Sequence, residues 1–267
     1  MQNESIGNIV KIALGVCIVC SVLVSTAAVT LNGIQTKNRQ LDRIKNILIA
    51  GDLYDPKTDI EKTYREVIEP VVIDLATGEV VDKTMFNEEL SIEHFDIKSL
   101  AEHPEYGATV PPEKDIAQIK RAPKYMLVYL VKKQDEVEKL IFPIYGKGLW
   151  STLYGFMALG NDLKTIQGLT FYEHGETPGL GGEVDNARWK KLWKGKLAYD
   201  EDWQVKITVI KGKVDGNRPE SVYQIDGLSG ATITTRGVDK LVKYWLGDDG
   251  YGRYLSKLRA GGEDEQG

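Results

Sequence analysis

Apolar residues are distributed unevenly along the chain, and the first long apolar run lies near the N-terminus. Residues 12–31 are uncharged and predominantly apolar, which is enough to cross the hydrocarbon core of a bilayer as an α-helix. A cleaved signal peptide is the alternative, because Ser25, Thr26 and Ala27 resemble a small-residue cleavage site. The length of the run favours a transmembrane anchor, which we place at residues 1–33 together with its short N-terminal tail.

Helical periodicity continues beyond this anchor. Apolar residues recur there at helical spacing: Ile34, Leu41, Ile44 and Leu48. They predict an amphipathic stalk helix, and we assign residues 34–123 to this stalk and an accessory α/β region. That region is predicted to hold a helix over residues 59–68 and a hairpin over residues 71–82. Residues 83–123, which are rich in charge and proline, are predicted to have little regular structure.

A different pattern, of short apolar segments separated by turn residues, begins at residue 124. It predicts strands over residues 125–131, 139–145, 151–159, 166–172 and 206–210. Helices are predicted over residues 186–193 and 237–246. The class is therefore α+β: one N-terminal transmembrane helix, then an extramembrane antiparallel-sheet domain with flanking helices. We place this domain at residues 124–258, followed by a disordered tail at residues 259–267.

Charge and cysteine content exclude several classes of function. A formal net charge of -5 and a pI of about 5.4 argue against a nucleic-acid partner. Both cysteines, Cys17 and Cys20, lie in the first apolar run, so the region beyond it has no thiols for disulfides or for zinc or iron-sulfur ligation. The histidines, His94, His103 and His174, are scattered, and we predict no metal site. The glycine fingerprints of dinucleotide-binding folds and P-loops are absent from the sequence.

Basic residues around the apolar run bear on its orientation in a membrane. Four of them follow the run within a short distance: Lys37, Arg39, Arg43 and Lys45. Only Lys11 and the amino terminus precede it. The positive-inside rule, taken alone, therefore predicts that the domain lies in the cytoplasm.

The stretch from residue 226 to 238, DGLSGATITTRGV, combines a turn, a run of small residues and a helix start. Asp226 and Gly227 predict the turn. Three small residues then let backbone amides approach a ligand closely: Ser229, Gly230 and Ala231. Thr234 or Thr235 is the predicted N-cap of the helix. A helix start carries unpaired N–H groups and a partial positive charge, so this segment is suited to hold a phosphate.

Three segments together resemble the FMN-binding domain family. They are GKGLW at residues 146–150, ETPGLG at residues 176–181 and DGLSGAT at residues 226–232, in the order in which the family has them. In that family the last threonine of the third segment is joined to FMN through a phosphodiester, which implies covalent FMN on Thr232. A plain capped turn is the alternative interpretation of the third segment by itself.

The resemblance also implies contacts to the flavin. An isoalloxazine ring is large, flat and mostly apolar, so we expect Trp150 and Leu180 to pack against it. Glu176, Thr177 and the amides around Gly179 are expected to bond its polar edge. Core packing is the alternative for Trp150, and a surface turn is the alternative for Glu176.

Attachment in the family is carried out by a separate flavin transferase, so no catalytic residue is predicted in this chain. Asp226 and Gly227 would then be recognised by that enzyme, or would only form the turn. The phosphodiester keeps one negative charge, which the helix start and Lys206 or Lys211 would balance.

The C-terminal stretch around residues 244–255, YWLGDDGYGRYL, is similar to the C subunits of sodium-translocating NADH:quinone reductases. This implies a single-pass protein of the bacterial inner membrane with its domain facing the periplasm. That orientation is opposite to the one that the positive-inside rule predicts. The similarity also implies an electron carrier between NADH and quinone, coupled to sodium translocation in the whole complex. The implied partners are the other membrane and peripheral subunits, the flavin transferase and membrane lipid. The alternatives are an Rnf-type ferredoxin:NAD flavoprotein subunit, or a non-redox membrane-anchored module that binds a phosphate ligand.

Overall fold

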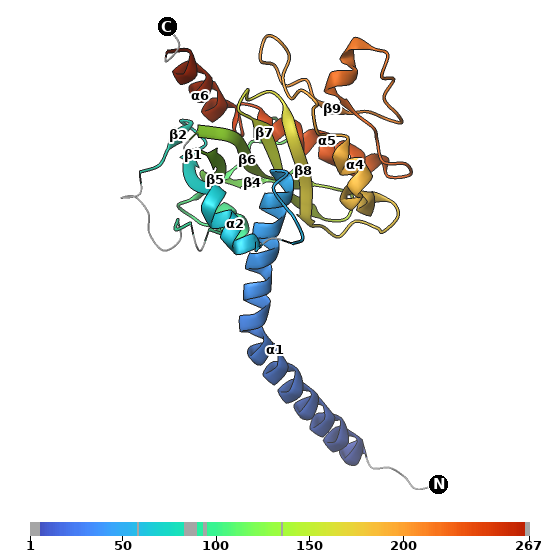
Figure 1. The fold of residues 1–267 in the computed structure, drawn as a ribbon. Helices are drawn as coiled ribbons and strands as arrows, with labels where there is room; N and C mark the ends of the chain where they lie inside the picture. The colour runs from blue at the N-terminus through green and yellow to red at the C-terminus, as the bar shows by residue number, and fades with distance from the viewer. Residues whose placement is uncertain (1–5, 58, 83–89, 93–94, 135, 265–267) are drawn as a thin grey trace. The chain divides into compact units, whose positions relative to one another are not determined.

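The computed structural model describes residues 6–57, 59–82, 90–92, 95–134 and 136–264 (Figure 1). It divides into two compact units, Met1–Arg43 and Ile44–Gly267. Helix α1 (Ile6–Ala50) contains the predicted apolar run and is long and apolar enough to cross a membrane. The boundary between the units lies at residue 43 rather than at the predicted residue 33. The reason is that the end of α1 is buried within the second unit, at Asn46, Ile47, Leu48 and Ala50.

The second unit is built on one six-stranded sheet with the strand order β2-β1-β5-β6-β7-β8. Its strands are β1 (Ile68–Asp74), β2 (Glu79–Val80), β5 (Tyr125–Lys133), β6 (Glu136–Lys147), β7 (Thr152–Gly160) and β8 (Ile166–Glu173). All neighbouring pairs are antiparallel, as predicted. β1 pairs with β5 from Ile68 opposite Val131 to Asp74 opposite Tyr125. The predicted boundary at residue 123 therefore does not separate two domains, because β1 belongs to the same sheet.

The segment before β5 has more regular structure than the sequence pattern predicted. It contains helix α3 (Ile97–Glu102) and an antiparallel pair formed by β3 (Gly107–Thr109) and β4 (Arg121–Pro123). The side chain of Asp96 caps α3 by accepting a hydrogen bond from the amide of Ser99 at 2.7 Å. The expectation of little structure is wrong for these elements. Residues 83–89 and 93–94, which include His94, lie outside the described residues.

Short helices flank the sheet. They are α2 (Ile60–Val67), α4 (Ala187–Lys191), α5 (Thr232–Leu246) and α6 (Gly252–Asp264), together with the 3-10 turns η2 (Gly181–Asp185) and η3 (Pro219–Tyr223). The strand predicted at residues 206–210 is short, β9 (Thr208–Val209), and pairs in parallel with β10 (Gln224–Ile225). Because α6 continues to Asp264, the predicted disorder is wrong for residues 259–264, and residues 265–267 lie outside the described residues.

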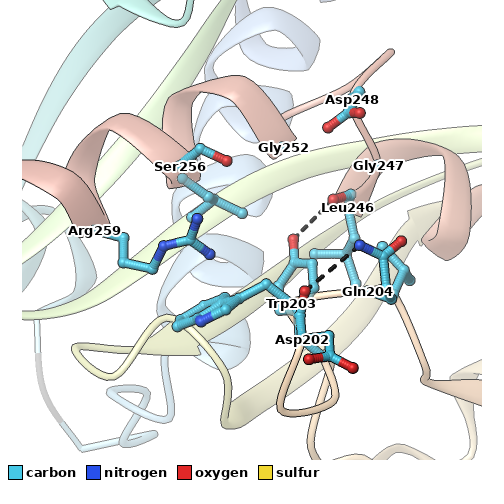
Figure 2. Close-up of a pocket in the computed structure, with 12 residues that line it drawn as sticks. Asp202, Trp203, Gln204, Leu246, Gly247, Asp248, Gly252, Ser256 and Arg259 are labelled. Carbon is cyan, nitrogen blue, oxygen red and sulfur yellow. Dashed lines mark hydrogen bonds between the residues drawn. The ribbon is translucent and has the colours of Figure 1, made fainter.

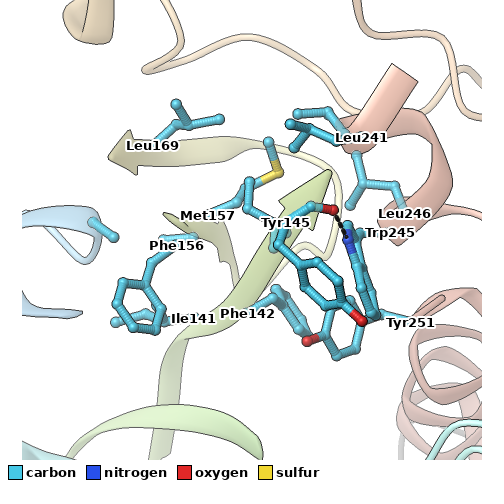
Figure 3. Close-up of a cluster of buried hydrophobic side chains, with 14 of the residues drawn as sticks. Ile141, Phe142, Tyr145, Phe156, Met157, Leu169, Leu241, Trp245, Leu246 and Tyr251 are labelled. Atoms are coloured by element: carbon cyan, nitrogen blue, oxygen red, sulfur yellow. Dashed lines mark hydrogen bonds between the residues drawn. The ribbon is translucent and has the colours of Figure 1, made fainter. Parts of the chain in front are cut away.

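Helix α5 is anchored on β6 by an apolar stripe. Its inward residues are fully buried at the predicted three- and four-residue spacing: Val238, Leu241, Val242 and Trp245. Trp245 packs against the rings of Tyr145 and Tyr251, and its Nε1 donates a hydrogen bond to the carbonyl of Tyr145 at 2.7 Å (Figure 3). A Cβ on Gly237 would lie 2.4 Å from the carbonyl oxygen of Lys147. This close approach sets the start of α5 beside the end of β6.

Candidate functional site

The segment that carries the predicted modification site is a tight turn leading directly into α5. The carbonyl of Leu228 accepts a hydrogen bond from the amide of Ala231 at 3.2 Å, and Gly230 has a φ of +72°, as a type II turn requires at its third residue. The helix then begins at Thr232, with Ala231 as its N-cap. Alanine has no side-chain acceptor for the first helical amides, which lack partners within the helix. These amides therefore suit an anionic ligand.

Three threonines near the start of α5 have very different environments. Thr232 is exposed, whereas Thr234 and Thr235 are 1% and 5% exposed. Thr234 Oγ1 donates to Glu176 Oε2 at 2.5 Å, and Thr235 Oγ1 accepts from the amide of Leu228 at 3.1 Å. The prediction that Thr234 or Thr235 caps the helix is wrong, because their hydroxyls bind groups outside the first turn and the helix starts earlier. Of these three hydroxyls, only that of Thr232 belongs to an exposed residue.

Glu176 is a buried carboxylate that joins the predicted segments. Its oxygens accept hydrogen bonds from the amides of Leu149, Trp150 and Ser151, with shortest distances of 3.1, 2.9 and 3.2 Å, and from the hydroxyl of Thr234. Burial acts to raise the pKa of Glu176, but the hydrogen bonds from Thr234 and the three amides outweigh it and lower the pKa. Glu176 is therefore not a surface turn residue. Its carboxylate accepts hydrogen bonds from protein donors. This differs from the prediction that Glu176 bonds the polar edge of the flavin.

The loop after Glu176 packs onto the turn that precedes α5. The carbonyl of Thr177 accepts from the amides of Leu180 and Gly182 at 3.1 and 2.9 Å, and Gly179 has a φ of +76°. A Cβ on Gly230 would lie 3.0 Å from Leu180 Cδ2. The second and third predicted segments are therefore direct neighbours, although about fifty residues separate them in the chain.

Large apolar side chains are exposed on the segments that meet near the start of α5. They are Leu149, Trp150, Leu180 and Ile233, and Trp150 is 67% exposed. Core packing of Trp150 is therefore excluded. We call this group the apolar rim. Ile233 was not predicted as a site residue. Its place between two threonines at a helix start could have indicated an exposed apolar side chain. An exposed apolar group of this kind marks an interaction site.

Asp226 and Gly227 hold the neighbouring loop in place. Asp226 Oδ1 accepts from the amide of Val214 at 2.8 Å, and the carbonyl of Asp226 accepts from Trp189 Nε1 at 2.8 Å. The amide of Gly227 donates to the carbonyl of Gly212 at 2.8 Å. These contacts give Asp226 and Gly227 a structural role in the turn.

The basic residues near this turn differ in their position. Lys211 directly precedes Gly212, the partner of Gly227. Lys206 precedes β9, where Thr208 donates to Asp239 at 2.7 Å, about two turns into α5. Lys211 is therefore the better placed of the two predicted lysines. Arg236, which was not predicted, is exposed four residues after Thr232 and thus on the same helical face.

A separate cavity of about 260 Å³ lies between the loop around Trp203 and the connection from α5 to α6 (Figure 2). Its lining includes Tyr199, Trp203 and Arg259, and the Arg259 guanidinium lies 4.4 Å from the centre of the Trp203 ring. None of its lining residues belongs to the three predicted segments. The cavity is therefore distinct from the candidate site.

A family model of known proteins matches the part of the chain that carries this site. Residues 148–247 match the family model of the FMN-binding domain, which covers all three glycine-containing segments apart from residues 146 and 147. The fold and the site thus define an FMN-binding domain that follows, in the sequence, a helix long and apolar enough to cross a membrane.

Curated relatives match over nearly the whole chain. The C subunit of the Na(+)-translocating NADH-quinone reductase from Pseudomonas aeruginosa is 43% identical over 263 residues, covering 97% of this chain and 98% of the relative. The protein of the same name from Vibrio alginolyticus is 41% identical over 260 residues, covering 97% and 98%. The chain belongs to the family of C subunits of the Na(+)-translocating NADH-quinone reductases.

Solved structures agree with this assignment. The crystal structure of Shewanella oneidensis NqrC has a TM-score of 0.74 and 33% sequence identity, covering 84% of this chain and 99% of that one. The crystal structure of the C subunit from Parabacteroides distasonis has a TM-score of 0.64 and 26% identity, covering 85% and 97%. The predicted α+β class with an antiparallel sheet is confirmed.

Proposed function

We propose that this protein is the electron-carrier subunit of a sodium-translocating NADH:quinone reductase, with FMN attached to Thr232 through a phosphodiester. The observation that supports it most strongly is the exposed position of Thr232, at a helix start that has no side-chain cap and that also carries Ile233 of the apolar rim. The flavin would supply reversible electron transfer, and the protein would relay electrons from NADH towards quinone. Sodium translocation would belong to the whole complex.

The described residues fit both parts of this cofactor. The first amides of α5 and the backbone of Ser229, Gly230 and Ala231 would hold the phosphate, helped by the positive end of the helix dipole. Lys211 and Arg236 would balance its charge. The apolar rim would contact the isoalloxazine ring, and the exposed loop with Thr177 and Gly179 would bond its polar edge.

Attachment requires one group transfer onto the chain. The Thr232 oxygen would attack the FMN phosphorus of flavin adenine dinucleotide, forming the oxygen–phosphorus bond. The phosphoanhydride bond breaks, AMP leaves, and the hydroxyl proton passes to a base of the separate flavin transferase. The buried hydroxyls of Thr234 and Thr235 support Thr232 as the acceptor, because both are already engaged within the protein. Asp226 and Gly227 would be the nearby recognition residues for the transferase.

The cellular setting follows from the family and the helix. A single pass of α1 would anchor the protein in the bacterial inner membrane, with the other subunits of the reductase as partners. We place the FMN-binding domain in the periplasm. The basic residues after the apolar run oppose this orientation, and packing among other membrane subunits would have to override them.

Mass spectrometry of the peptide with residues 226–236, from protein made with its flavin transferase, tests the proposal directly. The expected result is a mass increase of one FMN less water. It should be lost in Thr232→Ala and retained in Thr234→Ala, because only the first variant removes the exposed acceptor. An unmodified peptide from the native membrane would contradict the proposal and favour a non-redox phosphate-binding module.

A further inference from the structure

The carboxylate of Glu176 occupies a pocket that the backbone provides for it. A Cβ on Gly148 would lie 2.6 Å from Oε1, and a Cβ on Gly181 would lie 2.7 Å from Oε2. Side chains at these two positions would collide with the carboxylate. Two glycines of the family segments therefore make room for Glu176 in this fold, besides any role that they have at the flavin.

The hydrogen bonds of Glu176 connect elements that carry different parts of the apolar rim. The amides of Leu149, Trp150 and Ser151 hold the turn between β6 and β7, and the bond from Thr234 holds the first turn of α5. Because the carboxylate is buried and its pKa is lowered, it is ionised at neutral pH and all its bonds are charge-assisted. One side chain thus ties Trp150 to the helix start.

The bond to Thr234 also orients the first turn of α5, while the apolar stripe holds the later turns. Successive helical residues are about 100° apart around the axis, so Thr232 and Thr234 lie on nearly opposite faces of the first turn. With Thr234 held inward by Glu176, Thr232 must face outward. The same contact therefore helps to position the neighbouring Ile233, which belongs to the apolar rim.

We propose that Glu176 is the positioning residue for the bound flavin. It does not touch the ring through its carboxylate, but holds the Trp150 turn and the start of α5 in the relative position that seats the ring. The inference rests on the proposed function. Because Thr232 is exposed, attachment itself does not need Glu176, whereas the packing of the ring after attachment does.

The test uses full-length Glu176→Gln, made together with the flavin transferase and purified in detergent. Gln keeps the size of the side chain but turns one acceptor into a donor that faces amide N–H groups. We expect flavin on Thr232 at the wild-type level, with iodide quenching of flavin fluorescence several-fold stronger. The flavin midpoint potential should shift towards that of free FMN.

The matched control is Glu173→Gln, which makes the same chemical change three residues away in an exposed pair with Lys98. Its quenching and midpoint potential should equal those of the wild type. Thr234→Val provides a second, milder test, because it keeps the shape of Thr and removes only one hydrogen bond to Glu176. Thr234→Val should also increase quenching of the flavin fluorescence. Thr234→Ser keeps the hydroxyl and should therefore show the wild-type quenching.

The outcomes separate this inference from the proposed function. Wild-type quenching and potential in both Glu176→Gln and Thr234→Val would overturn the positioning role. If Glu176→Gln does not fold, the comparison of Thr234→Val with Thr234→Ser decides by itself. A wild-type protein without flavin on residues 226–236 would instead contradict the proposed function.

Discussion

The contact between α5 and β6 predicts an unusual response to a glycine-to-alanine change. In a helix interior this substitution normally stabilises by about 1 kcal/mol, because alanine has the higher helix propensity. At Gly237, however, the new Cβ would lie 2.4 Å from the carbonyl oxygen of Lys147 and 3.2 Å from Gly148 Cα. Both are backbone atoms and cannot rotate away. Helix α5 must therefore shift from the sheet.

Overpacking of this kind costs about 1–3 kcal/mol, against a gain in propensity of about 1 kcal/mol. We expect Gly237→Ala to lower the free energy of unfolding by up to about 2 kcal/mol, and to lower the melting temperature by up to about 8 °C for a domain of this size. The assay is thermal unfolding of the full chain in detergent, followed by circular dichroism. The displaced helix start should also weaken the seating of the flavin, measured as stronger iodide quenching.

Gly261 provides a matched control on another helix. It lies in α6, is exposed, and a Cβ there would meet nothing within 4 Å. Gly261→Ala should therefore be neutral or stabilising by up to about 1 kcal/mol. If Gly237→Ala were as stable as Gly261→Ala, the close approach of α5 to β6 would not constrain the helix, and the prediction would be refuted.

Two further predictions concern the core and the acid response. Trp245→Phe leaves the buried carbonyl of Tyr145 without its donor, so the free energy of unfolding should fall by about 2–3 kcal/mol in denaturant titration; an unchanged midpoint would contradict the role of this bond. Because the pKa of Glu176 is lowered in the folded state, its contribution to stability is present above its ordinary value of 4.5 and lost as the pH falls through the folded pKa. The melting temperature of wild type should therefore drop more steeply on acidification than that of Glu176→Gln, and parallel acid profiles would argue against an ionised, hydrogen-bonded carboxylate.

The parts of the fold that follow from local periodicity could be predicted from the sequence. The apolar run of α1 and the stripe of Val238, Leu241 and Trp245 on α5 were predicted because burial on one face leaves a direct record in residue spacing. The strands of the central sheet were found for the same reason, with ends that differ by only a few residues. The exposed position of Thr232 also agrees with its place in the predicted motif.

Features that depend on contacts between distant segments could not be predicted in this way. Nothing in the sequence around Glu176 shows that its carboxylate is buried and bound by residues 149–151 and by Thr234. The start of α5 was misplaced for a related reason, because Thr234 and Thr235 have the residue type of a cap but bind tertiary partners. β9 was predicted as part of a strand over residues 206–210, but its parallel partner β10 was not, because a two-residue strand carries too little pattern.

The exposed position of Thr232 has a consequence for how the protein would mature in the cell. Its neighbours Thr234 and Thr235 are sealed inside the folded domain, whereas Thr232 stays reachable after folding is complete. On the proposed attachment, chains that have already been inserted into the membrane remain substrates for loading. A cell short of riboflavin would then accumulate folded protein that lacks flavin and cannot carry electrons. A renewed supply of the vitamin would activate this protein without new translation.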